Sequence, residues 1–157
     1  MVQTKTLIAM GLTAISASSI ALAQISTEYP GTFCVVRGTT QNIFYGGNGD
    51  ARNPATNVSR FVCPAIQQGG DVVDLSLVSV LDSHSSDDVS CSVNVRGLGS
   101  LSGVVGPAVS SAGMGIQTLF FDPLPAFVNG VKFITCDVPE QQEGRTSRVL
   151  SYRVTEQ

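Results

Sequence analysis

The amino-acid sequence predicts an all-β protein, an antiparallel two-sheet β-sandwich of about eight strands. Three observations carry this prediction. Apolar residues recur at every second position in most apolar runs, and Gly, Pro, Asn, Asp or Ser bounds these runs. Apolar residues at helical spacing over three turns do not occur after residue 23. Finally, four cysteines, an even number, are what a fold with two disulfides requires.

The first 23 residues predict a secretory signal peptide. Lys5 precedes an apolar run diluted by Gly, Ser and Thr, and Ala21-Leu22-Ala23 ends it as a small-x-small cleavage site. The run is too short and too diluted for a membrane-spanning helix, which needs about 20 strongly apolar residues. We therefore expect cleavage of residues 1–23, with residues 24–157 forming a single secreted β-sandwich domain that has no membrane span.

Three short strands are expected in the first part of that domain. They cover residues 31–38 (GTFCVVRG), 41–47 (QNIFYGG) and 59–66 (SRFVCPAI). Pro64 in the third strand indicates a sheet edge or the end of ladder pairing, because proline cannot donate a ladder hydrogen bond. Residues 46–49 (GGNG) predict a tight turn, since glycine and asparagine tolerate positive φ.

Two well-patterned strands follow, at residues 71–82 and 89–97. In the first, alternation places Val73, Leu75, Leu77 and Leu81 on one face and Asp74, Ser76 and Val78 on the other. In the second, it places Val89, Cys91, Val93 and Val95 on one face and Ser90, Ser92, Asn94 and Arg96 on the other. The polar residues 83–87 between these strands predict a hairpin loop.

Three more strands complete the pattern, at residues 115–123, 130–139 and 147–156. In the last of them Leu150, Tyr152 and Val154 alternate with Ser151 and Arg153. The uncharged, glycine-rich residues 97–115 predict a long connection that crosses between the sheets, with a mobile or adhesive surface loop as the alternative. Strands at this spacing indicate a sandwich of jelly-roll or immunoglobulin-like kind, although a true immunoglobulin domain would bury a tryptophan and this chain has none.

The cysteines Cys34, Cys63, Cys91 and Cys136 are expected to form two disulfides. An exported chain meets an oxidising compartment. A zinc site would favour close Cys-x-x-Cys pairs, which the sequence lacks. Three connectivities are open; we favour Cys34 with Cys63 and Cys91 with Cys136, because each pair then joins two predicted strands.

The charge balance argues against a nucleic-acid partner. After loss of Lys5, the remaining basic residues face 12 acidic ones, for a net charge near −4. Lys132 is then the one lysine left. Binding to phosphates needs clustered lysine and arginine, so we expect no nucleic acid among the partners.

One stretch, residues 80–91 (VLDSHSSDDVSC), holds the single histidine of the chain, His84, among serines and aspartates. A Ser-His-Asp hydrolase would also need an oxyanion hole and a cleft, and the sequence has no Gly-x-Ser-x-Gly elbow. Asp82, Asp87 and Asp88 are candidate calcium ligands, because calcium prefers several carboxylate oxygens, although their spacing is not that of an EF-hand.

These observations predict a non-enzymatic module with a structural or interaction role, secreted or periplasmic after bacterial-type export. The alternative is a carbohydrate- or calcium-binding module that uses loops at one end of the sandwich. The expected partner is an unknown extracellular protein or glycan. No cofactor is expected apart from candidate calcium. The chain has no tryptophan and only three tyrosines, so few side chains are available to stack on a sugar ring.

Overall fold

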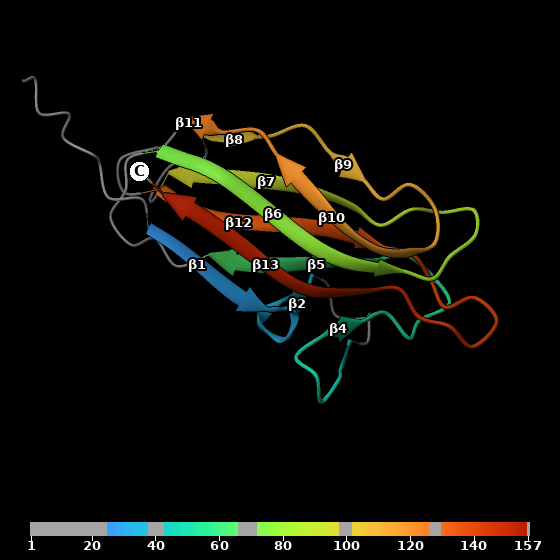
Figure 1. Ribbon diagram of the computed structural model, residues 1–157. Coiled ribbons are helices and arrows are strands. Elements are labelled where there is room, and N and C mark those ends of the chain that lie inside the picture. Colours follow the sequence, from blue (N-terminus) through green and yellow to red (C-terminus); the bar gives the residue numbers. More distant parts are fainter. Residues whose placement is uncertain (1–24, 38–42, 66–71, 98–101, 126–129, 157) are drawn as a thin grey trace, which may run out of the picture.

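The structure, a computed structural model, describes residues 25–37, 43–65, 72–97, 102–125 and 130–156. Within these ranges the chain forms strands and one short 3-10 helix, η1 (Gly31–Phe33), and no α-helix. The strands make two antiparallel sheets that lie face to face, as Figure 1 shows. The predicted all-β sandwich is therefore confirmed. The predicted signal peptide, residues 1–23, lies outside the described residues.

Sheet A has seven strands in the described residues. They are β1 (Ile25–Pro30), β3 (Phe44–Tyr45), β4 (Ala51–Arg52), β6 (Val72–Asp82), β10 (Gly115–Phe121), β11 (Leu124–Pro125) and β13 (Arg148–Glu156). The order is β10-β6-β13-β4-β3, with β1 also paired to β13 and β11 to β6. The long strands β6 and β13 therefore form its centre.

Sheet B has six strands in the described residues. They are β2 (Val35–Val36), β5 (Ser59–Ala65), β7 (Ser90–Gly97), β8 (Gly103–Val105), β9 (Val109–Ser110) and β12 (Gly130–Val138). The order is β2-β5-β12-β7-β8, with β9 also paired to β7. The central strand β12 thus pairs along most of its length with both β5 and β7.

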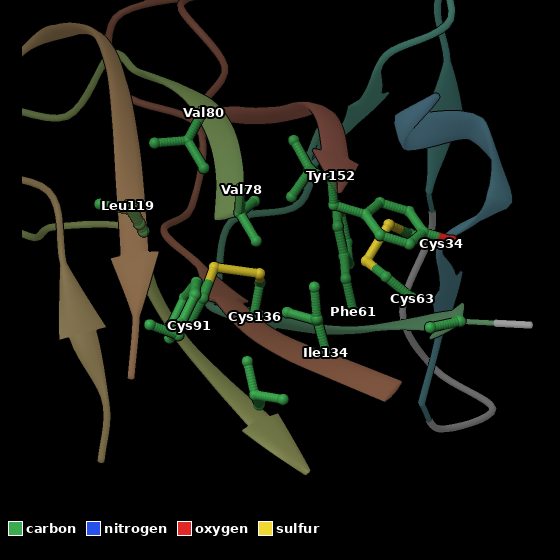
Figure 2. Packing of buried hydrophobic residues seen from close by; sticks show 14 of the residues in the cluster. Cys34, Phe61, Cys63, Val78, Val80, Cys91, Leu119, Ile134, Cys136 and Tyr152 are labelled. Atoms are coloured by element: carbon green, nitrogen blue, oxygen red, sulfur yellow. A yellow bond between two sulfur atoms is a disulfide. The ribbon is translucent and has the colours of Figure 1, made fainter. Parts of the chain in front are cut away.

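The apolar core lies between the inner faces of the two sheets (Figure 2). Its largest fully buried side chains include Tyr152, Phe61, Ile134, Val78 and Val80. The Tyr152 hydroxyl donates to the carbonyl of Pro64 at 2.6 Å, which links β13 of one sheet to β5 of the other. Burial raises the pKa of the Tyr152 phenol, so this hydroxyl stays protonated and able to donate.

The connection after β6 is not the predicted hairpin. Strand β6 belongs to sheet A and β7 to sheet B, so residues 83–89 cross from one sheet to the other. Both edges of β6 are taken by other strands of its own sheet, β13 on one side and β10 with β11 on the other. Polar, turn-favouring residues suit either kind of connection, which is why the sequence pattern alone predicted the wrong one.

The glycine-rich segment 97–115 also carries more structure than predicted. It does cross between the sheets, because β9 lies in sheet B and β10 in sheet A. Before crossing, it adds the short strands β8 and β9 to the edge of β7. Gly103 permits this pairing, since a Cβ there would come within 2.9 Å of the Val95 carbonyl oxygen.

The alternation predicted for the longest strands holds with one exception. In β7 the buried apolar side chains are Cys91, Val93 and Val95, as expected, and Asn94 of the opposite face is also buried. In β6 the inner face is the one that carries Val78. In β13 the register shifts between Val149 and Ser151, so Leu150 does not share the buried face of Tyr152 as the pattern predicted.

Both disulfides lie within sheet B. The structure joins Cys34 to Cys63 and Cys91 to Cys136, so the two predicted disulfides are present. Cys91 and Cys136 are directly opposite each other in the β7–β12 ladder. Cys34 precedes β2 and bonds to β5, so the two bridges crosslink neighbouring strands of the same sheet rather than the two sheets.

We predict that replacing Cys91 and Cys136 by serine lowers the free energy of unfolding by about 4 kcal/mol. The bridge closes a segment of 45 residues, and the loss follows from the extra freedom of the unfolded chain. Urea unfolding followed by circular dichroism measures it. The matched variant without the Cys34–Cys63 bridge, whose separation is 29, should lose slightly less. Wild-type stability in the first variant would contradict the prediction.

A buried carboxylate organises the hairpin of β3 and β4. Asp50 is 2% exposed and accepts a hydrogen bond from Arg52 Nε at 2.6 Å and one from an Arg148 terminal nitrogen at 3.3 Å. The two arginines are directly opposite each other in the β13–β4 ladder, where like charges would repel. Burial alone would raise the pKa of Asp50, but the Arg52 hydrogen bond and both arginine charges outweigh it and lower that pKa.

The lowered pKa of Asp50 predicts a loss of stability in acid. Because the folded-state pKa lies below the unfolded-state value, the stabilisation is present above about pH 4 and disappears as pH falls through the folded pKa. Asp50→Asn should cost about 2 kcal/mol at neutral pH and make stability less dependent on pH below 4. Urea unfolding from pH 2 to 7 tests this. The prediction is wrong if the free energy of unfolding of the variant falls below pH 4 as steeply as that of the wild type.

Candidate functional site

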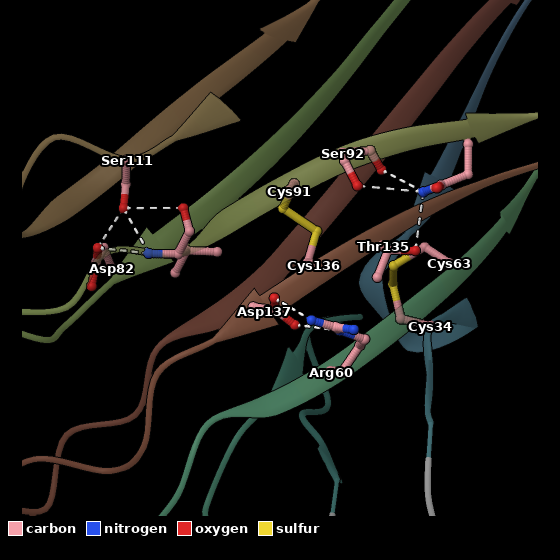
Figure 3. The surroundings of a disulfide bond; sticks show 12 residues. Cys34, Arg60, Cys63, Asp82, Cys91, Ser92, Ser111, Thr135, Cys136 and Asp137 are labelled. Carbon is pink, nitrogen blue, oxygen red and sulfur yellow. Dashed lines mark hydrogen bonds and ion pairs between the residues drawn. A yellow bond between two sulfur atoms is a disulfide. The ribbon is translucent and has the colours of Figure 1, made fainter. Parts of the chain in front are cut away.

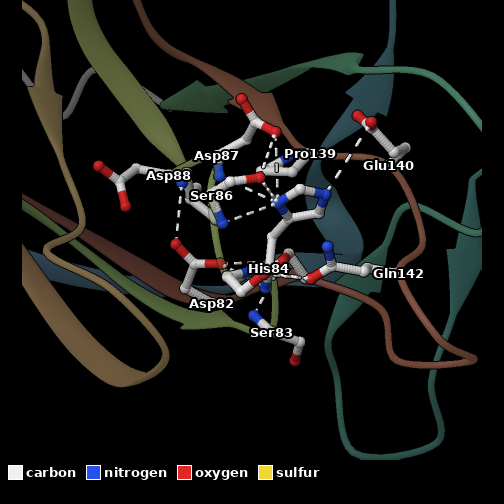
Figure 4. A network of polar contacts seen from close by, with 12 residues as sticks. Asp82, Ser83, His84, Ser86, Asp87, Asp88, Pro139, Glu140 and Gln142 are labelled. Carbon is white, nitrogen blue, oxygen red and sulfur yellow. Dashed lines mark hydrogen bonds and ion pairs between the residues drawn. The ribbon is translucent and has the colours of Figure 1, made fainter.

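His84 lies in the crossing loop and serves the conformation of that loop. Its ring is 5% exposed, and Nδ1 accepts the backbone N–H of Asp87 at 2.9 Å and that of Ser86 at 3.4 Å (Figure 4). Nδ1 also lies 3.3 Å from an Asp87 carboxylate oxygen, and Nε2 lies 3.9 Å from a Glu140 oxygen. The lone pair that a catalytic base or a metal ligand needs at Nδ1 is therefore already engaged by the backbone.

Asp82 joins three connections at this end of the sandwich. Its side chain is 1% exposed. One oxygen accepts the His84 N–H at 3.0 Å and the Ser147 hydroxyl at 3.1 Å, and the other accepts the Val89 N–H at 3.2 Å and the Ser111 hydroxyl at 2.5 Å. Four protein donors thus satisfy the carboxylate, which ties the crossing loop to the segments before β10 and β13.

The three predicted calcium ligands are not gathered by the structure. Asp82 is buried with its four donors, whereas Asp87 and Asp88 are exposed. In the described part of the chain, the group whose ligand atoms lie within 4.8 Å of one another is His84, Asp87 and Glu140. A histidine nitrogen is not a calcium ligand of choice. Calcium binding by Asp82, Asp87 and Asp88 stays a prediction.

A groove on the outer face of sheet B is the better-built candidate site. Its larger hollow, of about 320 Å³, lies over β5, β12 and β7, next to the edge strands β8 and β9. The side chains that line it point away from the core, because they alternate with the buried residues of the same strands. The lining includes Arg37, Arg60, Ser90, Ser92, Asn94, Thr135, Asp137 and Phe133.

One end of this groove carries a two-point ion pair between neighbouring strands. Arg60 of β5 and Asp137 of β12 are opposite each other, and the guanidinium donates to both carboxylate oxygens at 2.6 and 2.7 Å (Figure 3). The hydrogen bond and the charge of Asp137 raise the pKa of Arg60, which stays charged. Both side chains remain accessible, at 50% and 39%, so a ligand could share their donors and acceptors.

The middle of the groove is a hydrogen-bonded polar floor. Asn94 is 8% exposed, and its amide nitrogen donates to the Ser92 carbonyl and to the Thr135 hydroxyl, both at 3.1 Å. These bonds hold the side chains of β7 and β12 in fixed positions. Hydroxyl and amide groups can both donate and accept, which suits a ligand rich in hydroxyls.

A second hollow extends the groove along the same face. It has about 250 Å³ and shares Asn94, Val105 and Phe133 with the first. At its far end lie Arg96 of β7 and Gly103 of β8. Phe133 is the aromatic side chain that both hollows contain, so the groove offers one ring for stacking among polar groups and an apolar rim.

The alternation in β7 predicted a polar face opposite the apolar one, but it did not predict a binding site on that face. A signal was nevertheless present. Ser90, Ser92, Asn94 and Arg96 are hydrogen-bonding residues, whereas solvated faces are commonly rich in lysine and glutamate. The three tyrosines do not contribute to the groove: Tyr29 stacks on Tyr152 at 5.0 Å in the core, and the Tyr45 hydroxyl donates to the Cys34 carbonyl.

Comparison with known proteins finds similar folds among solved structures of carbohydrate-binding modules. No protein-family model and no curated protein sequence matches the chain. Among solved structures, the xylan-binding module CBM15 matches with a TM-score of 0.57 and 11% identity, covering 85% of this chain and 97% of the module. The module CBM36 in complex with calcium and xylotriose matches with a TM-score of 0.51 and 9% identity, covering 83% and 99%. Identities this low show a shared β-sandwich fold.

A third structural match is to a longer protein. A family two carbohydrate esterase from Cellvibrio japonicus aligns with a TM-score of 0.49 and 9% identity over 86% of this chain. The chain spans 35% of the length of that esterase.

In the described residues, no helix has the length and apolar character needed to cross a membrane.

We predict that Asp82→Asn lowers the free energy of unfolding by about 2 to 3 kcal/mol, with or without calcium. The amide would turn two hydrogens toward groups that now donate to the carboxylate. Thermal unfolding in calcium and in chelator measures the effect, with the exposed Asp87→Asn as the matched control. A calcium-dependent rise in the melting temperature that disappears in Asp82→Asn would instead identify Asp82 as a calcium ligand.

Proposed function

We propose that this protein is a non-enzymatic carbohydrate-binding module whose glycan ligand lies along the outer face of sheet B. The observation that carries the proposal is the groove itself, a polar floor with the phenyl ring of Phe133 in its middle. The fold shared with the xylan-binding module CBM15 supports the same class of ligand. Of the two expectations from the sequence, the carbohydrate-binding alternative thus has more support than an unspecified interaction module.

The chemistry of the groove suits a sugar chain. Sugar hydroxyls need donors and acceptors in turn, and the floor offers the hydroxyls of Ser92 and Thr135, the carboxylate of Asp137 and the guanidinium of Arg60. Phe133 offers an apolar surface for one face of a sugar ring. The proposed site lies on the face of a sheet, whereas the binding module expected from the sequence would use loops at one end of the sandwich.

The strand directions make the groove long enough for several sugar residues. Ser90 and Arg96 lie at opposite ends of its lining on β7, six residues apart, which corresponds to about 20 Å along a strand. The floor between them is held by backbone ladders and by the Asn94 hydrogen bonds. A site on paired strands needs little reordering on binding, which favours affinity for a flexible chain.

We further infer an exported protein with residues 1–23 as its signal peptide and residues 24–157 as one domain. Two disulfides are typical of an oxidising compartment outside the cytosol. A glycan partner is compatible with such a location. The choice between periplasm and extracellular medium does not affect the proposed site.

Affinity gel electrophoresis with soluble xylan and a panel of other polysaccharides tests the proposal. We expect xylan or another glycan of the panel to retard the wild-type protein. Phe133→Ala should weaken that retardation by about tenfold, equivalent to about 1.4 kcal/mol of lost ring contact.

Phe120→Ala is the matched control. Phe120 is 61% exposed on the outer face of sheet A, away from the groove, so its loss should leave retardation unchanged. Circular dichroism of both variants confirms that they fold. The proposal fails if no glycan retards the wild type, or if Phe120→Ala abolishes retardation while Phe133→Ala does not.

A further inference from the structure

We propose, on the basis of the glycan-binding function above, that the ligand is an acidic glycan whose carboxylate groups are bound by Arg37 and Arg96. The proposal comes from the distribution of charge. Arg37, Arg60 and Arg96 line the two hollows of the groove, against one acidic residue, Asp137. The groove is therefore locally positive in a chain whose formal net charge is −3.

Arg37 and Arg96 differ from most other arginines of the described chain in having no acidic partner. Asp137 neutralises Arg60 within the groove. On sheet A, Asp50 is shared by two arginines and Glu28 pairs with Arg153 at 3.1 Å. Among the described residues in or directly beside the strands of the two sheets, the arginines without an acidic partner are therefore Arg37 and Arg96, which line the groove.

The two free arginines stand at different places along the groove. The backbone N–H of Arg37 donates to the carbonyl of Arg60 at 2.9 Å, so Arg37 lies at the Arg60–Asp137 end of the sheet. Arg96 lies at the far end of β7, opposite Gly103 of β8. Both side chains are exposed. A chain that follows the groove past Phe133 would meet one guanidinium at each end.

A carboxylate is the charged group that these arginines fit best. A guanidinium presents planar paired donors that match the two oxygens of a carboxylate. Phosphates of nucleic acid would match as well, but stacked bases need aromatic platforms, and among the described residues that line the groove Phe133 is the one aromatic residue. A ligand whose hydroxyls bind to Ser92 and Thr135, and whose carboxylates bind to the arginines at the two ends, would pair with the polar groups along the whole groove.

The test compares two forms of one polymer, a xylan that carries uronic acid groups and the same xylan after chemical reduction of its carboxyl groups to alcohols. Isothermal titration or affinity electrophoresis measures both affinities at low salt and at 0.5 M salt. We expect the acidic form to bind about fivefold more tightly at low salt, because exposed charge pairs contribute modestly, and the difference to shrink with salt.

Variants assign the preference to the two arginines. Arg37→Gln combined with Arg96→Gln should bring the ratio of affinities close to one. Arg153→Gln on sheet A, which removes the same charge away from the groove, should leave the ratio as in the wild type. Duplex DNA serves as a polyanion without sugar carboxylates and should bind more weakly than the acidic xylan.

Each other result has a separate meaning. Equal affinity for the acidic and the reduced xylan would overturn the acidic ligand while glycan binding stands. Binding of neither xylan, together with failure of the wider glycan panel, would overturn the proposed function itself. DNA binding as tight as that of the acidic xylan, or a ratio that survives in the double variant, would overturn the role assigned to Arg37 and Arg96.

Discussion

The register between β7 and β12 is the constraint on which both the core and the groove depend. Because side chains alternate along a strand, a slip of one residue would turn Asn94 inward and Val93 outward, along with every other residue of β7. The Cys91–Cys136 bridge joins directly opposite residues and so excludes that slip. The same disulfide therefore fixes which residues of β7 face the core and which face the groove.

The residues that attract attention in the sequence stabilise the fold, and less conspicuous ones form the groove. Asp82 and His84 accept hydrogen bonds from backbone and hydroxyl groups of the crossing loops. These loops pass from one sheet to the other, and their buried polar groups need such partners. Ser92 and Thr135 lie on regular strands and line the groove. Rigid strands are a more exact support for binding groups than loops are.

Period-two alternation predicted the long strands well, because burial of one face dominates their energetics. The pattern could not say which sheet a strand joins, so the crossing at residues 83–89 was mistaken for a hairpin. It could not reveal the register shift at Leu150, where a single extra residue changes the face. Strands of two or three residues, such as β4 and β8, are too short for any period. The groove could not be predicted from the sequence, because the residues that line it come from strands that are distant in sequence.

The overall charge and the groove charge act on an acidic ligand at different distances. The chain as a whole is negative, so an acidic polymer feels weak repulsion on approach, which salt screens beyond about 8 Å. Attraction by Arg37 and Arg96 operates only at contact, where the hydrogen bonds of the floor also form. A polyanion that does not fit the floor meets the repulsion without the compensating contacts. Selectivity for acidic glycans over other polyanions can therefore arise from a surface with little aromatic material, provided that charge and hydroxyl recognition coincide in one groove.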